Sequence, residues 1–329
     1  MIRSLGAVCR SLGVVVSAAT LAALALPCFA AGYPEKPVRI VTPFPPTSVT
    51  DILARPIAAK LTEAWGQTVL VDNRSGAAGI PGAEVVAKAA PDGYTLLLGT
   101  NATHAINPAL YKVLPYDAVR DFAPITLIAN SYVLLVVNPA VKANSVSELL
   151  ALSKKQALNY GTAGSGSSPH LAGELFKTMA GIDMLAVPYK GSPQILLDLV
   201  AGRIDVYFSN AAAALPQLKA GKLRLLAITS AKRDAAMPDV PTVSEAGVPG
   251  YEATSWFGMY APAKTPRDIV SKLNADINRV VAQPEMHKLF AGSALEAVGG
   301  GTPAEFAAFN RREIEKWTKV VQVSGATPD

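Results

Sequence analysis

The chain has 329 residues, of which half are hydrophobic, and a formal net charge of +5 at pH 7. This length is sufficient for two domains, each with its own core. The charge, which falls to +3 if residues 1–30 are removed, is too weak and too dispersed for a nucleic-acid-binding protein. Both cysteines, Cys9 and Cys28, lie among the first 30 residues. If that segment is removed, the remaining chain has no thiol, which excludes thiol chemistry, disulfides and thiolate metal sites.

The first 30 residues have the pattern of a secretory signal peptide. Arg3 and Arg10 give a basic start, residues 12–26 form an uncharged apolar run, and Cys28-Phe29-Ala30 offers a cleavage site after Ala30. The apolar run is too short to span a bilayer. A lipid anchor on Cys28 is disfavoured because Leu26 and Pro27 precede it where small residues would be needed. We therefore expect residues 1–30 to be cleaved and the mature protein to be exported with a charge of +3.

Strands and helices alternate along the mature chain. Near-continuous apolar strands, each followed by a helix with one apolar face, are typical of a mostly parallel sheet covered on both faces. The expected strands are residues 38–42, 68–71, 94–98, 158–160, 185–189, 204–208 and 223–229. The tail is expected to be helical, because Thr265-Pro266-Arg267-Asp268 and Thr302-Pro303-Ala304-Glu305 both resemble helix starts with a capping hydroxyl.

Two long extended stretches interrupt this alternation, at residues 125–138 and 251–261. Each is suited to a crossing between two α/β units. We therefore expect one domain from residues 31–131 plus 254–329 and a second from residues 132–253. Two such units joined by two crossings indicate a clamshell that binds its ligand in the interdomain cleft.

Three strand-to-helix loops share one design, at residues 43–51, 76–82 and 161–170, and the polar stretch 99–104 follows another strand. Such loops sit at the carboxyl ends of parallel strands, where ligands bind. Glycine and hydroxyl residues at a helix start expose N–H groups and the positive end of the helix dipole, which bind anions. A single loop of this kind often serves only to turn the chain. Because the sequence repeats the design in several loops, we favour a role in ligand binding. The aromatic residues beside these loops, Phe44, Tyr189, Phe208 and Trp256, can pack on a ligand's carbon skeleton or, more commonly, in the core.

Several catalytic and cofactor sites are disfavoured by the motifs. The glycines at 76, 79 and 82 do not have the dinucleotide-binding spacing, and there is no phosphate-binding Gly-Lys-Ser/Thr motif. The three histidines are scattered without nearby acids, so no metal is expected. An exported hydrolase that uses Ser165 or Ser167 with His170 is the alternative function. The Gly-x-Ser-x-Gly elbow is absent, however, so we expect no enzyme activity and no cofactor.

A series of short motifs in fixed order resembles the solute-binding receptors of tripartite tricarboxylate transporters, the Bug family of periplasmic binding proteins. The motifs span nearly the whole mature chain, and their order makes the resemblance specific. They are residues 33–41 (Tyr-Pro-Glu-Lys-Pro-Val-Arg-Ile-Val), 43–46, 50–55, 71–74 with Gly76, 90–96 (Ala-Pro-Asp-Gly-Tyr-Thr-Leu), 103–108, 187–191, 238–242 and 245–247.

The resemblance implies an α/β, two-domain, type II periplasmic-binding-protein fold that closes on a small organic carboxylate. It also implies a periplasmic location and delivery to the membrane subunits of a transporter or to a sensor kinase, and we expect a monomer. In the family, the loop after the first strand and the Ser/Gly-rich loop of the second domain hold the carboxylate. Together with the loop and aromatic residues above, the expected ligand-binding residues are Phe44, Thr47, Ser48, Asp51, Thr103, Ser165, Gly166, Ser167, Ser168, His170, Tyr189, Phe208 and Ser209.

Two departures from the family pattern concern the choice of ligand. Thr47-Ser48 stands where the family usually has Gly-Gly, which predicts a narrower, hydroxyl-lined approach to the backbone. Ser209 stands where the family often has Asp, between Phe208 and Asn210. The missing acid predicts a changed preference for the far end of the ligand.

Overall fold

The computed structural model describes residues 32–162, 167–189, 191–234 and 237–327. The expected signal peptide, residues 1–30, lies outside the described residues. Residues 36–329 form one compact unit, distinct from the unit of residues 1–35, and all the elements below belong to it.

The first sheet has the order β2-β1-β3-β9-β4, with the short β10 on the far side of β4. β1, β2 and β3 are parallel, whereas β9 runs antiparallel to both β3 and β4. The expected sheet was mostly parallel; the observed one is mixed, because the two crossing strands β4 and β9 run in opposite directions. The strands are β1 (Val38–Thr42), β2 (Val69–Asn73), β3 (Thr95–Thr100), β4 (Phe122–Val137), β9 (Thr254–Pro262) and β10 (Glu296–Ala297).

The second sheet is built on the last residues of β4. Its parallel strands are β5 (Asn159–Thr162), β6 (Leu185–Pro188) and β7 (Val206–Asn210), and β7 and β8 (Arg224–Ile228) run antiparallel to β4. β4 pairs with β9 up to Tyr132 and with β7 from Val133 onward. One sixteen-residue strand therefore belongs to both sheets. The fold is a two-domain α/β fold, and the domain boundaries expected from the sequence stay a prediction.

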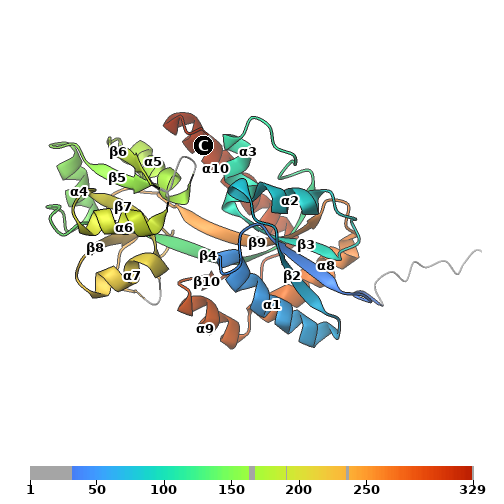
Figure 1. Cartoon of the computed structure of the whole chain (residues 1–329). Coiled ribbons are helices and arrows are strands. Elements are labelled where there is room, and N and C mark those ends of the chain that lie inside the picture. Colours follow the sequence, from blue (N-terminus) through green and yellow to red (C-terminus); the bar gives the residue numbers. More distant parts are fainter. Residues whose placement is uncertain (1–31, 163–166, 190, 235–236, 328–329) are drawn as a thin grey trace, which may run out of the picture. The chain divides into compact units, whose positions relative to one another are not determined.

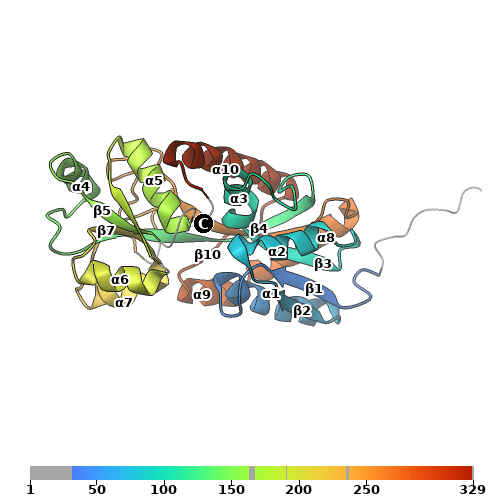
Figure 2. The same ribbon diagram turned by 45° about the horizontal axis from the view of Figure 1, so that its top comes forward.

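Helices cover both faces of each sheet (Figures 1 and 2). The side chains of β4 alternate between two cores, as a period of two requires: Val133 and Leu135 pack with α5 and α10, and Leu134 and Val136 pack with α6 and α7. The helices are α1 (Val49–Trp65), α2 (Ile80–Ala87), α3 (Asn107–Leu110), α4 (Val146–Ser153), α5 (Ser168–Ala180), α6 (Ser192–Val200), α7 (Ala211–Lys219), α8 (Arg267–Val281), α9 (Pro284–Gly292) and α10 (Pro303–Ser324), with short turns η1 (Ala77–Gly79) and η2 (Ala102–Ile106).

A buried carboxylate ties α10 to the crossing strand β9. Glu313 Oε2 accepts hydrogen bonds from the indole N–H groups of Trp256 and Trp317, each at 3.0 Å. Its other oxygen pairs with Lys316 of the same helix. The charge of Glu313 is therefore compensated within the core, as a buried carboxylate requires. Trp256, which could have faced a ligand, is fully buried here.

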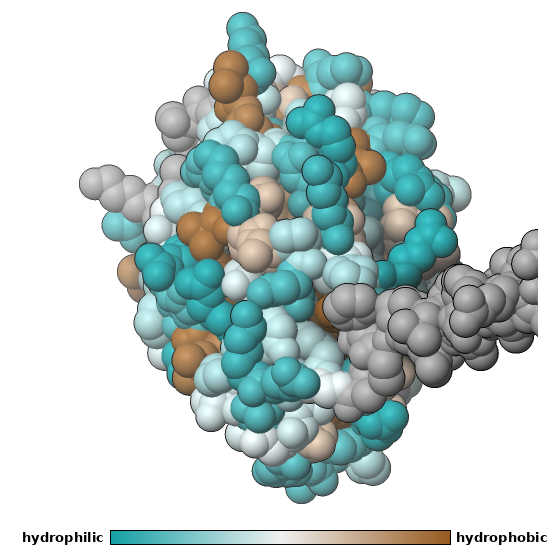
Figure 3. Space-filling model, turned by 90° about the vertical axis from the view of Figure 1, so that its right-hand side faces the viewer, coloured by the Kyte–Doolittle hydropathy of each residue, from teal (hydrophilic) through white to brown (hydrophobic). Residues whose placement is uncertain are grey.

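The surface drawn in Figure 3 is mostly hydrophilic, and its hydrophobic residues are scattered in small groups. Single apolar residues on a surface are common in globular proteins and need no partner. Among the described residues, no helix has the length and apolar character needed to cross a membrane.

Candidate functional site

The loop after β1 ends in a capped helix start. Ser48 is the residue before α1, and its Oγ accepts a hydrogen bond from the backbone N–H of Asp51 at 3.4 Å. A serine in this position with an acid three residues later is a strong helix-start signal. The hydroxyls of Ser48 and Thr50 are also 3.0 Å apart. The start of α1 thus carries two hydroxyls at the carboxyl end of β1, as the sequence predicted; that of Ser48 belongs to a half-buried residue and that of Thr50 to a buried one.

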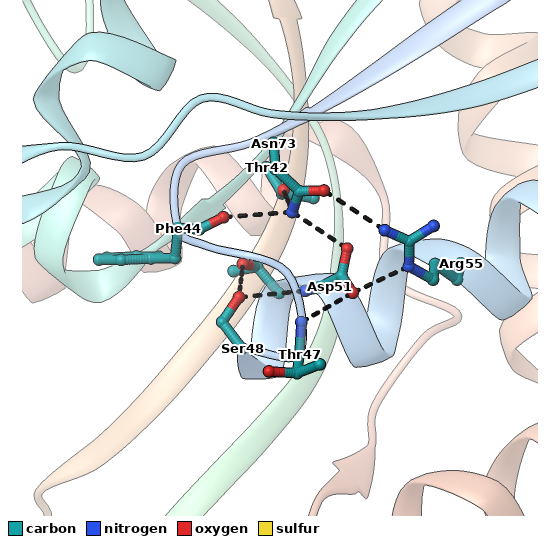
Figure 4. A network of polar contacts seen from close by, with 8 residues as sticks. Thr42, Phe44, Thr47, Ser48, Asp51, Arg55 and Asn73 are labelled. Carbon is teal, nitrogen blue, oxygen red and sulfur yellow. Dashed lines mark hydrogen bonds and ion pairs between the residues drawn. The ribbon is translucent and has the colours of Figure 1, made fainter.

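Asp51 turns back into the protein rather than standing alone at the helix start (Figure 4). Its Oδ2 accepts from the backbone N–H of Thr47 at 3.0 Å and pairs with Arg55 Nε at 2.8 Å. Its Oδ1 accepts from the amide of Asn73 at 3.0 Å. The Arg55 hydrogen bond, with those from Thr47 and Asn73, holds the pKa of Asp51 below its usual range despite burial. Asp51 therefore stays ionised and fixes the loop.

Asn73 holds the loop from the neighbouring strand. Its Nδ2 also lies 2.6 Å from Thr42 Oγ1 and 3.2 Å from the carbonyl oxygen of Phe44, and Arg55 Nη2 donates to its Oδ1 at 3.4 Å. The parallel pairing of β1 with β2 sets Asn73 beside Thr42. The sequence analysis missed both Asn73 and Arg55 as site residues. The available signal for Asn73 was a polar side chain just after a predicted strand, at the edge where the loops gather.

Thr47 has a backbone conformation that is unusual for a β-branched residue. Its φ is +67°, in the left-handed region that favours glycine. The family resemblance predicts glycine at this position. The loop therefore keeps the backbone shape suited to glycine while carrying a threonine side chain, which is exposed. Its N–H is held by Asp51, so the strained conformation is fixed by a buried partner.

The loops after β1, β2 and β3 meet at Gly79. A methyl group at this glycine would lie 2.9 Å from Thr103 Cγ2, 3.0 Å from Pro43 Cβ and 3.3 Å from Phe44 Cζ. Such distances leave no room for any side chain, and the φ of +76° also requires glycine. Phe44 is half-buried and Thr103 is fully buried. The structure thus brings Phe44 and Thr103 together beside the start of α2.

The hydroxyl of Thr103 is used within the protein. It donates to the carbonyl of Thr100 at 3.1 Å and lies 2.8 Å from Nδ1 of His104. His104 stacks on Tyr260 with ring centroids 3.9 Å apart and is fully buried, and burial lowers the pKa of His104 to about 3. His104 is therefore neutral and supplies no cation for an acidic ligand. Within the described parts of the chain, no cluster of three or more metal-ligating residues is found.

The start of α5 repeats the capped design of α1. Ser167 precedes the helix in an extended conformation, and its Oγ accepts from the N–H of His170 at 3.4 Å. Ser167 and Ser168 are half-buried, and the side chain of His170 is largely buried. The first turn, residues 168–171, contains no acidic residue. Two further expected ligand-binding residues, Ser165 and Gly166, lie outside the described residues.

The remaining predicted residues of the second sheet differ in exposure. The N–H of Tyr189 donates to the carbonyl of Thr162 at 2.8 Å, and its hydroxyl donates to Asp198 of α6 at 2.9 Å. Phe208 is fully buried, and its ring packs on the rings of Tyr160 and Phe176. The structure thus gives Phe208 the core role, the commoner one for such aromatics.

Ser209 is fully buried as well, and its hydroxyl donates to the carbonyl of Asn210 at 3.1 Å. The next residue, Asn210, is exposed at the carboxyl end of β7. Sequence reasoning did not select Asn210, although it follows the strand directly. It is the polar side chain that this strand presents at the edge where the loops gather.

A cavity of about 870 Å³ lies elsewhere, beyond the end of β8. None of the expected ligand-binding residues that the structure describes lines it. Its lining comes from residues 230–234, from Asn130, Glu252 and Thr254, from His287 and Ala291 of α9, and from residues 294–297, which include β10.

The fold thus places two serine-capped helix starts at the carboxyl ends of β1 and β5. Residues 53–326 match the family described as tripartite tricarboxylate transporter family receptor, and the chain belongs to this family. Members of this family are solute-binding receptors, so the chain is a binding protein and the hydrolase alternative is wrong.

Three solved structures support this assignment. Rpa4515 of R. palustris, solved with adipate, is 41% identical with a TM-score of 0.76 over 90% of this chain and 100% of that one. MatC of Rhodopseudomonas palustris, with bound malate, is 33% identical with a TM-score of 0.71 over 88% of this chain and 100% of that one. The periplasmic binding protein BugD is 32% identical with a TM-score of 0.72 over 90% of this chain and 99% of that one.

Proposed function

We propose that this receptor is exported to the periplasm and captures a small organic carboxylate between the starts of α1 and α5. The observation that carries the proposal is the pair of serine-capped helix starts at Ser48 and Ser167. N–H groups in the first turn of a helix have no partner within the helix, and they attract negative charge together with the helix dipole. Hydroxyls at the same ends add further donors.

The class of ligand comprises di- and tricarboxylates, aromatic acids and acidic amino acids. Aliphatic dicarboxylates are the first to test, because two of the similar structures hold adipate and malate. Specificity would come from donors in the two helix starts, and closure of the two domains would exclude water and strengthen those contacts. A few charge-assisted hydrogen bonds and one buried carbon skeleton supply about −8 kcal/mol, which corresponds to micromolar affinity.

The test is a thermal-melting panel on the mature protein, with adipate, malate, citrate, benzoate and glutamate. A ligand at about 100 times its Kd stabilises the folded state by about 2.7 kcal/mol and raises the melting temperature. The diamides of adipate and malate are matched controls, because they keep the carbon skeleton and lose the charge. Calorimetry then measures the Kd of each positive acid. If no acid raises the melting temperature, or if acids and amides act equally, the proposal fails.

Delivery of the ligand to the membrane subunits of a tripartite tricarboxylate transporter is the second part of the proposal, and we expect the receptor to act as a monomer. Uptake of the radiolabelled acid by cells with and without the receptor gene tests it. Loss of uptake in the deletion strain is expected. Unchanged uptake together with a lost transcriptional response to the acid would instead assign the receptor to a sensor kinase.

A further inference from the structure

A groove of about 460 Å³ lies where α10 packs against α5, apart from the candidate ligand site. It is lined by two residues of α5 and one face of α10. The α10 residues recur at helical spacing over the twelve positions 312–323, so the groove runs about 16 Å along this helix. The lining residues are Leu175 and Thr178 of α5, and Arg312, Glu315, Lys316, Lys319, Val320 and Val323 of α10.

The floor of the groove is apolar. Leu175 and Val320 are buried in it, and Val323 at its far end is 65% exposed. Val323 extends the apolar lining of the groove to the surface at the end of α10. Apolar surface rimmed by polar residues is typical of an interaction site.

The rim of the groove carries an excess of positive charge. Lys316 already pairs with Glu313, whereas Arg312 and Lys319 are exposed and form no ion pair with any residue that the structure describes. Glu315 is the single acid among the lining residues. An apolar floor between free cations is complementary to an apolar stripe flanked by acids.

We propose that this α5–α10 groove docks an acidic amphipathic helix of a partner protein. A third helix laid into the groove between two packed helices buries apolar residues spaced three and four apart, and its flanking acids meet Arg312 and Lys319. The walls of the groove are helical, so a strand would find no free sheet edge to pair with. The proposal does not depend on the ligand, and a failure of carboxylate binding leaves it untouched.

The probe is a fluorescein-labelled synthetic peptide of about four helical turns, with leucines at positions i, i+3, i+4 and i+7 and glutamates between them. Its binding to the mature protein is measured by fluorescence anisotropy at low and physiological salt. A second peptide has lysine in place of each glutamate. We expect saturable binding of the acidic peptide, weakened by salt, and little binding of the basic one.

Arg312→Glu and Lys319→Glu are each expected to raise the Kd of the acidic peptide about fivefold, and Val323→Asp is expected to raise it by a similar factor. Arg311→Glu is the matched control, since Arg311 is an exposed neighbour on α10 that does not line the groove. Circular dichroism and melting curves verify that each variant is folded. The proposal is overturned if the acidic peptide does not bind, if both peptides bind equally, or if Arg311→Glu weakens binding as much as Arg312→Glu. Competition by vesicles of phosphatidylglycerol and phosphatidylcholine in equal parts, but not by phosphatidylcholine alone, would assign the groove to an anionic membrane surface.

Discussion

The starts of α1 and α5 use the same cap and differ in the residue three positions later. Both caps, Ser48 and Ser167, are extended serines whose hydroxyl accepts the N–H of that third residue. In α1 the third residue is Asp51, and in α5 it is His170. The negative charge of Asp51 is compensated by Arg55, whose Nε lies 2.8 Å away, and Asp51 also accepts a hydrogen bond from the loop. The start of α1 therefore carries a fixed network with little net charge. The first turn of α5 carries no acid, so no carboxylate of that turn offsets the positive end of its dipole.

This difference assigns different tasks to the two halves under the proposed function. The α1 half is a preformed wall, because its loop is held by Asn73 and Asp51, which are residues of the protein itself. The α5 half supplies the favourable electrostatic field for a carboxylate. Changes at α5 should therefore act mainly on ligand affinity, and changes at α1 mainly on stability.

The largest effect is expected when α5 is given an acid. Ser168→Glu places a carboxylate at the first position of α5. Two unit charges about 6 Å apart in an effective dielectric of about 20 repel by about 3 kcal/mol, so the Kd for a carboxylate should rise about 100-fold. An acid in the first turn interacts favourably with the helix dipole, so the free energy of unfolding of the unliganded protein should rise by about 0.5 kcal/mol. Calorimetry and urea unfolding measure the two quantities.

Ser168→Gln is the control, because its side chain has a similar size and no charge. It should raise the Kd for a carboxylate far less than Ser168→Glu does. Equal losses in the two variants would mean that the shape of the side chain, and not the field at α5, governs binding. A loss of stability in parallel with affinity would point to a disturbed helix start.

The next effect is a loss of stability at α1. Asp51→Ala leaves the N–H of Thr47 without its acceptor and removes one of the three acceptors of the Asn73 amide, which should lower the free energy of unfolding by about 2 kcal/mol. Arg55→Ala should cost clearly less than Asp51→Ala, because Arg55 is more than half exposed and solvent screens its charge. Urea unfolding measures the free energy of unfolding of both variants. Equal costs would mean that the ion pair, rather than the loop contacts, carries the stabilisation.

The same site predicts a pH dependence. The Arg55 hydrogen bond, with those from Thr47 and Asn73, keeps the pKa of Asp51 lower in the folded state than in the unfolded state. The stabilisation from Asp51 is therefore fully present above the unfolded pKa and is lost as the pH falls below about 4, through the folded value. The stability difference between wild type and Asp51→Asn should be constant from pH 7 to about pH 5 and should shrink below that. A difference that does not change down to pH 2 would contradict the assignment.

The smallest effect is expected at Thr47. Thr47→Gly removes the cost of a left-handed β-branched residue, about 1–2 kcal/mol, and adds flexibility to the unfolded chain, which offsets part of it. A net gain of up to about 1 kcal/mol in urea unfolding is expected. Thr47→Ala keeps a Cβ in the same conformation and should give no such gain. If both substitutions behave alike, the φ of +67° does not persist in solution.

The helix starts were readable from the sequence because they depend on local chemistry. Ser48 with Asp51, and Ser167 followed by Pro169, are short-range signals that bond within one turn. The direction of the Asp51 side chain was not readable, because it depends on Asn73 of the neighbouring strand. The sequence suggested Asp51 as a ligand-binding residue at a helix start. The pairing of β1 with β2 instead brings Asn73 within hydrogen-bond distance of Asp51, and the two residues hold the loop.

Burial explains the other differences. Phe208 and Ser209 follow each other at the end of β7, and the sequence alone does not reveal that both are buried, Phe208 against the rings of Tyr160 and Phe176. Thr103 lies in a polar stretch that suggests a loop, but it folds as the η2 turn and buries its hydroxyl. Whether such a side chain is exposed depends on packing against residues distant in the sequence, and a local sequence pattern contains little information about that packing.

The continuous strand β4 limits how this receptor can be divided. Its residues up to 132 complete one sheet, and its last five residues form a central strand of the other. A cut between residues 132 and 133 would sever the strand that both sheets share and remove the continuous backbone that joins them. Engineering that exchanges ligand-binding halves between related receptors should therefore place its junctions outside β4, so that the strand is inherited whole.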